Sequence, residues 1–181
     1  LRQAGPATRV EMLRLAAEGH RTLSLGQGRA LIWARNPEPI PTVDVLEIFR
    51  KKTAPAFEVA LRLGACLAGA DAETHDVLRK YSEALGIAYQ IMDDLEDREE
   101  DRRLSVVLAI AHKRALEGEE KELIRSLFRP GAPPANGELA RILKERGVIE
   151  KAEDLLEAYK EEAIRSLRFL SNPTLKGLLR R

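Results

Sequence analysis

Three aspartates at the end of an apolar segment are the residues of this chain best suited to chemistry. Asp93, Asp94 and Asp97 follow a segment whose apolar residues recur three or four positions apart, which predicts a helix. Those apolar residues are Leu85, Ala88, Met92 and Leu95. On a helix, Asp93 and Asp97 share one face, with Gln90 one turn earlier. Carboxylates one helical turn apart can bind Mg²⁺, which takes few protein oxygens as ligands and leaves its other coordination positions to water and phosphate.

A plainer interpretation is an acidic helix end that faces solvent before the charged segment 98–103. An isolated buried carboxylate is very costly, so a helix with two apolar flanks must direct its carboxylates toward water or a charged ligand. The polar positions form one stripe at helical spacing: Ser82, Gly86, Gln90, Asp93 and Asp97. This context favours a ligand site, but the residues by themselves leave both interpretations open.

The segment 86–97 resembles the second aspartate-rich motif of the trans-isoprenyl diphosphate synthases, with Tyr89 where the family usually has Phe. These enzymes condense an allylic diphosphate with isopentenyl diphosphate, giving farnesyl, geranylgeranyl or longer polyprenyl diphosphates. The resemblance implies that Asp93, Asp94 and Asp97 bind Mg²⁺, that Asp93 is catalytic and that Gln90 orients the substrate. It also implies an all-α, isoprenoid-synthase-like bundle of long helices around a central cavity.

Two weaker motifs precede the aspartates in the order that the family would have. Gly26-Gln27 resembles a Gly-Gln pair whose Gln faces the substrate cavity, and Lys52-Thr53-Ala54 resembles a Lys-Thr-Ala segment at a helix kink. The resemblance assigns substrate binding to Gln27, Lys52 and Thr53, and a catalytic contact with the allylic diphosphate to Lys52. Alone, each motif fits a surface Gln or a solvated Lys. Their order, each about one helix further along, gives them weight.

The chain also departs from the family pattern. Ala30 stands where the family has an Asp three residues after the Gln, and the Gly-Lys loop expected after Asp97 is missing. Arg103 and Ser105 stand where the family has Lys and Thr. These departures keep open a second interpretation, a catalytically degenerate paralogue that acts as a non-catalytic subunit or binding partner of a synthase. A third is a helical interaction module whose acidic helix end is coincidental.

The resemblance is close over 26–97 and looser up to Leu170, and no first aspartate-rich motif precedes Asp93. We therefore expect residues 1–181 to be the C-terminal part of a single isoprenyl diphosphate synthase-like domain, without its N-terminal helices. Two aspartate-rich motifs normally face each other across three Mg²⁺ ions, so we expect the chain by itself to be inactive. Its exposed apolar surface should associate as a homodimer or with a synthase subunit.

Composition limits the other classes of function. Lys and Arg total 30 against 29 acidic residues, so no overall field favours nucleic acid or a membrane surface. No apolar run approaches the about 20 residues of a membrane-spanning helix, and no signal peptide is visible. A single cysteine, Cys66, excludes an internal disulfide and is expected to be buried. We expect a cytoplasmic protein without stable membrane insertion.

The helices that must position the motifs can be predicted in order. The first is expected over 7–34, with an apolar face that comprises Val10, Leu13, Ala17, Leu23, Leu31 and Trp33. Its glycines imply either a break near Gly19 or the close approach of another backbone. The second is expected over 43–68 with a kink, because Pro55 cannot donate to the carbonyl of Lys51. Gly69 is expected to end it, and Asp71 to start the helix that carries the aspartates.

The remainder is predicted to be helical as well. Helices are expected over 104–116, 119–128, 138–146 and 149–170, with the most evident break at 129–137. His75 and His112 have no partner at ligand spacing, so surface or helix-end positions are expected for them. His20 precedes Gln27 on the same expected helix and could approach the cavity, but a position without a chemical role is favoured. No alternation typical of strands occurs.

Overall fold

The computed structural model describes residues 4–96, 104–129, 131 and 137–180, and every regular element in these ranges is helical. The predicted all-α class is therefore confirmed. In chain order the elements are α1 (Pro6–Arg35), α2 (Thr42–Lys52), α3 (Ala54–Leu67), α4 (Ala72–Glu96), α5 (Val106–Arg114), α6 (Glu119–Leu127), α7 (Glu138–Glu145), α8 (Val148–Ser166), the 3₁₀ helix η2 (Leu167–Phe169) and α9 (Pro173–Leu179).

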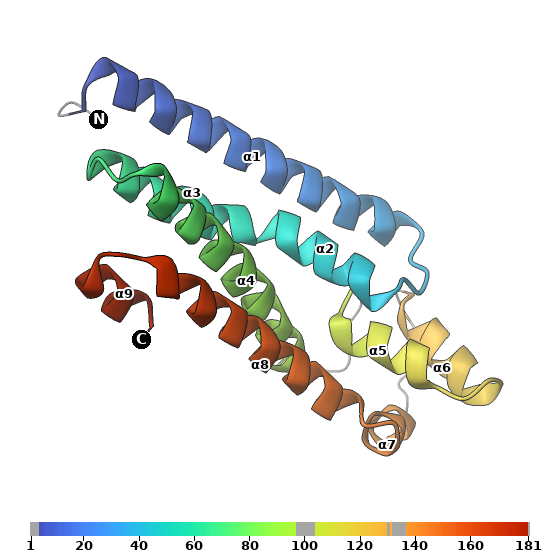
Figure 1. Ribbon diagram of the computed structural model, residues 1–181. Helices are drawn as coiled ribbons and strands as arrows, with labels where there is room; N and C mark the ends of the chain where they lie inside the picture. The colour runs from blue at the N-terminus through green and yellow to red at the C-terminus, as the bar shows by residue number, and fades with distance from the viewer. Residues whose placement is uncertain (1–3, 97–103, 130, 132–136, 181) are drawn as a thin grey trace.

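The long helices lie side by side in the order α1, α2 with α3, α4, α8 (Figure 1). Helix α4 packs against α3 on one side and α8 on the other, so it lies inside the bundle. The short helices α5, α6 and α7 gather at the end of the bundle where α4 ends. No helix in the described ranges is long and apolar enough to cross a bilayer.

The main hydrophobic core lies where α2, α4, α5 and α8 meet. All residues of α5 from 106 to 111 are buried, which their uniformly apolar sequence requires, since none of its faces suits water. Several core side chains are less than 2% exposed: Val45, Phe49, Ile87, Ile91, Val106, Ile124 and Ile142. Burying each of them stabilises the fold by about 1.5–3 kcal/mol. This core holds the C-terminal half of α4, where the aspartates lie.

Helix α1 buries the face opposite to much of the predicted one. Val10 and Leu13 are 67% and 65% exposed, whereas the buried residues of the helix are Met12, Leu15, Gly19 and Gly26. The prediction was wrong for Val10, Leu13, Ala17 and Leu31, because glycines, which have no side chain, allow α1 to approach α2 and α3 closely on the other side. It was right for Trp33, which packs against the main core. The helix runs unbroken through Gly19, so of the two predicted alternatives close approach is the one found.

The predicted kink before Pro55 is present. Helix α2 ends at Lys52, α3 begins at Ala54, and Thr53 between them has φ −125° and ψ −50°. Gly69, with φ +68°, ends α3 as predicted: its N–H donates to the carbonyl of Cys66. In the same turn the N–H of Ala70 donates to the carbonyl of Ala65, which completes a Schellman motif.

The start of α4 was also predicted correctly. The carboxylate Oδ1 of Asp71 accepts a hydrogen bond from the N–H of Thr74 at 2.8 Å, which satisfies one of the unpaired donors of the first turn. The later helices agree with the predicted ranges to within a few residues, but α9 was not predicted. Asn172 caps it by accepting from the N–H of Leu175, with Pro173 in its first turn. That Asn-Pro pair is a helix-start signal in the sequence.

A charged cluster joins α6 to α7 and α8. Arg146 donates to both carboxylate oxygens of Glu120, at 2.9 Å and 3.1 Å, and Arg141 lies 3.5 Å from the same group. Hydrogen bonds from Arg146 and from the N–H of Leu116 lower the pKa of Glu120 from its ordinary 4.5 to about 2. The ionised carboxylate therefore favours the folded state.

We expect Glu120→Gln to lower the melting temperature at neutral pH. Because the pKa of Glu120 is lower in the folded state, its contribution is complete above pH 4.5 and is lost as the pH falls toward 2. Circular-dichroism melts across this range should show the difference from wild type shrinking and then vanishing. Glu153→Gln, at an exposed position, is the matched control. A difference that does not depend on pH would contradict the assignment.

Candidate active site

The C-terminal half of α4 carries a buried amide beside a partly exposed carboxylate. Gln90 is 8% exposed, and its Nε2 donates to Oδ2 of Asp93 at 3.1 Å. Its other polar atom, Oε1, is buried and has no hydrogen-bond partner among the described residues. A buried acceptor without a partner costs about 1–3 kcal/mol. The Oε1 atom of Gln90 can therefore accept a hydrogen bond from a ligand, or from a water molecule bound with the ligand.

Asp94, although adjacent to Asp93, faces a different environment. It is 7% exposed, and its Oδ2 accepts from the N–H of Val106 at 2.5 Å. Val106 is the first residue of α5, and the side chain of Ser105 caps this helix by accepting a hydrogen bond from the N–H of Leu108 at 3.0 Å. Asp94 therefore connects the C-terminal end of α4 to the N-terminal end of α5 through a hydrogen bond.

The predicted metal ligands are only partly within the described residues, because Asp97 lies outside them. The described residues alone contain no group of three or more His, Cys, Asp or Glu side chains that could hold a metal ion. Asp93 and Asp94 offer carboxylate oxygens, the donors that Mg²⁺ prefers. The unpartnered oxygen of Gln90 beside Asp93 could accept from a metal-bound water. The chemistry of these donors fits Mg²⁺, and the assignment of Asp93, Asp94 and Asp97 stays a prediction.

The basic residues that end α2 differ in their partners. Arg50 pairs with Glu83 at 3.2 Å, and Lys51 pairs with Glu47 at 3.0 Å. Lys52 forms no ion pair within the part of the chain that the structure describes, and its Nζ lies 5.8 Å from the ring centroid of Phe49. Of the three cations, Lys52 is therefore the one whose charge is not already compensated by a described carboxylate.

The three sequence motifs meet at the junction between α2 and α3. Gly26 contacts the backbone of Lys51 and Lys52, and Gly86 contacts the backbone of Ala54. Gln27, next to Gly26 in α1, is exposed, and Thr53 at the junction is partly buried. The Gly-Gln pair of α1 thus lies against the end of α2, and the helix that carries Gln90 and the aspartates lies against the start of α3, so both meet the junction that bears Lys52 and Thr53.

Two large side chains of α4 remain accessible beside this junction. Tyr89 is 44% exposed and Met92 is 40% exposed, so the predicted burial of Met92 was wrong. Among the described residues nothing covers them fully, although Phe57 of α3 packs edge-on against Tyr89 at a centroid distance of 6.0 Å. An apolar surface of Phe57, Tyr89 and Met92 therefore accompanies the polar residues, and sequence analysis did not identify it as part of a site.

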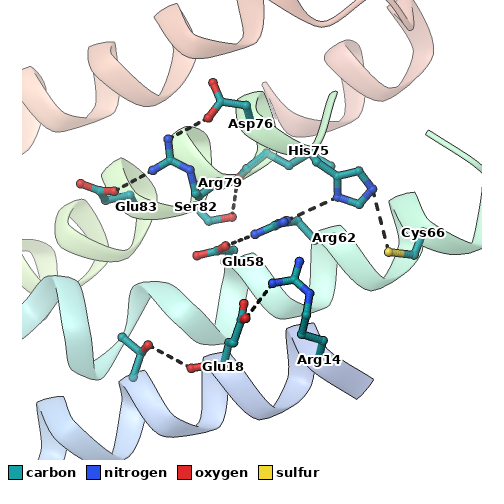
Figure 2. A network of polar contacts seen from close by, with 12 residues as sticks. Arg14, Glu18, Glu58, Arg62, Cys66, His75, Asp76, Arg79, Ser82 and Glu83 are labelled. Carbon is teal, nitrogen blue, oxygen red and sulfur yellow. Dashed lines mark hydrogen bonds and ion pairs between the residues drawn. The ribbon is translucent and has the colours of Figure 1, made fainter. Parts of the chain in front are cut away.

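A second polar cluster lies toward the other end of α4 (Figure 2). Nε of Arg62 donates to Nδ1 of His75 at 3.4 Å, so Nε2 carries the proton and faces Sγ of Cys66 at 3.9 Å. Burial, with the adjacent Arg62, lowers the pKa of His75, and burial raises the pKa of the Cys66 thiol. Both groups are therefore neutral near pH 7, which disfavours a cysteine nucleophile here. Cys66 is only partly buried, contrary to prediction, whereas His75 lies in the first turn of α4, a helix-end position as predicted.

An all-helical bundle that carries a Gly-Gln pair, a kinked Lys-Thr pair and an aspartate-bearing helix in this order agrees with the resemblance to the isoprenyl diphosphate synthases. Comparison with known families agrees with this assignment. The polyprenyl synthetase family matches residues 1–104, which is more than half of the chain. The chain belongs to this family.

Individual relatives support the same assignment. An all-trans-nonaprenyl-diphosphate synthase of Rhodobacter capsulatus is 26% identical over 172 residues, covering 87% of this chain and 53% of the relative. The farnesyl diphosphate synthase of Escherichia coli is 35% identical over 91 residues, covering 49% of this chain and 30% of the relative. The chain spans about half the length of the first of these relatives.

Solved structures share the fold. A geranylgeranyl pyrophosphate synthase of Corynebacterium glutamicum, complexed with isoprenyl diphosphate and magnesium, superposes with a TM-score of 0.84 at 21% identity. That match covers 97% of this chain and 54% of the other. A polyprenyl synthetase of Streptomyces coelicolor gives 0.82 at 22% identity, over 96% of this chain and 57% of the other.

Proposed function

We propose that the chain forms the C-terminal part of a prenyltransferase domain that condenses an allylic diphosphate with isopentenyl diphosphate into a longer isoprenyl diphosphate. The observation that carries the proposal is the convergence of the three motifs at the α2–α3 junction. Gly26 of α1 and Gly86 of α4 both pack onto the segment 51–54, which bears Lys52, and Gln90 and Asp93 follow Gly86 on α4. Family membership supports the same reaction class.

Each residue has a role that its chemistry suits. Mg²⁺, when bound by Asp93, Asp94 and Asp97, supplies positive charge that stabilises the departing diphosphate. Lys52 adds a further cation to the diphosphate oxygens as the carbon–oxygen bond breaks. Gln90, together with Gln27 and Thr53, orients the substrate.

The remaining steps involve the substrates themselves. Loss of the diphosphate leaves an allylic carbocation, which isopentenyl diphosphate attacks through its double bond to form the new carbon–carbon bond. The released pyrophosphate then takes the proton that the condensation product loses. Phe57, Tyr89 and Met92 provide an apolar surface on which the isoprenoid chain can lie away from water.

The test is incorporation of labelled isopentenyl diphosphate by the full-length protein, with an allylic diphosphate, in the presence and absence of Mg²⁺. We expect a longer isoprenyl diphosphate only with Mg²⁺, and no product from residues 1–181 alone. A full-length protein that neither binds the diphosphate nor makes product would refute the proposal.

A second candidate is a non-catalytic subunit of such a synthase, favoured by Ala30 at the position where the family has an Asp. In the same assay this subunit would bind diphosphate without forming product. It would also raise or alter the output of a synthase mixed with it. Exposed apolar residues on α1, including Val10 and Leu13, support association with a second chain, which light scattering of the full-length protein can detect.

A further inference from the structure

Two glycines from different helices lie in close contact with one short backbone segment, residues 51–54. A Cβ atom on Gly26 of α1 would lie 2.5 Å from the carbonyl carbon of Lys51 and from the nitrogen of Lys52. A Cβ atom on Gly86 of α4 would lie 2.5 Å from Cα of Ala54 and 2.7 Å from its nitrogen. Ordinary contacts begin near 3.4 Å, so a methyl group at either position must displace the segment by about 1 Å.

Other helical glycines in the chain differ from these two. Gly28, two residues after Gly26 on the same helix, has no atom within 4 Å of the Cβ position. At Gly19 the obstacle is a side-chain methyl group of Val59 on α3, and not the backbone of the segment 51–54. Because Gly26 and Gly86 meet backbone atoms, no change of rotamer can make room for a larger residue.

In the segment 51–54, which lies between the two glycines, the regular backbone hydrogen bonding of the helix is interrupted. Thr53 has φ −125° and ψ −50°, outside regular helix, and Pro55 has no N–H to donate to the carbonyl of Lys51. Its position therefore depends on the neighbouring helices more than on its own hydrogen bonds. Since Lys52 belongs to this segment, whatever holds the segment also sets where the ammonium group can reach.

We propose that Gly26 and Gly86 are positioning residues, which hold the segment 51–54 from two sides so that Lys52 meets the diphosphate of the substrate. The inference rests on the proposed function, since it concerns the same site. A displacement of about 1 Å at a binding group can cost about 100-fold in a reaction that depends on alignment. Alanine at either glycine should therefore act through Lys52.

The experiment is calorimetric titration of inorganic pyrophosphate with Mg²⁺ into the full-length protein. We expect Gly26→Ala and Gly86→Ala to weaken binding by about 10- to 100-fold, the loss expected when the charge-assisted contact of Lys52 is misplaced, and Gly28→Ala to leave binding within about twofold. Calorimetry separates affinity from the fraction of molecules that bind, so partial unfolding lowers the stoichiometry rather than the affinity.

A double variant identifies the route of the effect. If Gly26 acts through Lys52, adding Lys52→Ala to Gly26→Ala should weaken binding little further, because the cation is already misplaced. Independent, multiplicative losses would overturn the inference, as would unchanged affinity in both glycine variants. If neither variant folds, Ala54→Gly loosens the same segment without adding an atom, and its unchanged affinity would likewise overturn it. Wild-type protein that binds no pyrophosphate would refute the proposed function itself, and this inference with it.

Discussion

Lys52→Ala should weaken the binding of an allylic diphosphate by about 10- to 100-fold, the equivalent of one charge-assisted hydrogen bond of about 1.5–3 kcal/mol. Lys52 has no carboxylate partner within the described part of the chain, so its charge is available to a ligand. Its Nζ lies near the ring of Phe49, a contact that limits the freedom of the side chain before binding.

Lys51→Ala is the matched control for this prediction. Lys51 has the same charge as Lys52 and lies on the same helix, but its Nζ forms an ion pair with Glu47 at 3.0 Å on the surface. Such pairs contribute about 0–1 kcal/mol, and their loss should leave diphosphate affinity nearly unchanged. Titration of both variants of the full-length protein with Mg²⁺ compares them directly. Equal losses in the two variants would mean that general positive charge, and not the position of Lys52, attracts the ligand.

Local signals made much of the architecture predictable. Pro55 lacks an N–H, Gly69 adopts a positive φ and Asp71 accepts from the first turn of α4, and each of these acts within a few residues of its own position. The helix boundaries therefore followed from the sequence. The order of the three motifs also indicated the family, which the comparison then confirmed.

Features that depend on distant partners were not predictable in the same way. The buried side of α1 is set by the contacts of Gly19 and Gly26 with α2 and α3, so the larger apolar residues gave the wrong face. The hydrogen bond from the N–H of Val106 to Asp94 joins residues that are 12 apart in the sequence. Neither hydrophobic periodicity nor a motif encodes such a contact, because it arises only when helices pack.

The last prediction separates the roles of two neighbouring aspartates. Asp93→Ala should abolish most Mg²⁺-dependent diphosphate binding and reduce prenyl transfer by about 100-fold or more, as loss of a key electrostatic group does. Among the described residues its contact is one hydrogen bond from Gln90, so the free energy of unfolding should change by only about 1 kcal/mol. Clustered carboxylates without metal repel one another, which reduces even this loss.

Asp94→Ala, which also removes a proposed Mg²⁺ ligand, should in addition destabilise the fold by about 1–3 kcal/mol, because it leaves the buried N–H of Val106 without its acceptor. Urea unfolding of both variants, alongside titration of an allylic diphosphate with and without Mg²⁺, measures the two effects independently. If Asp93→Ala binds diphosphate as well as wild type, α4 simply ends in an acidic, solvent-facing turn and the proposed site is wrong. If Asp94→Ala is as stable as wild type, the connection from α4 to α5 does not depend on its carboxylate. We therefore expect a marked loss of stability only for Asp94→Ala, because Asp93 is partly exposed beside Gln90 whereas Asp94 is buried against the start of α5.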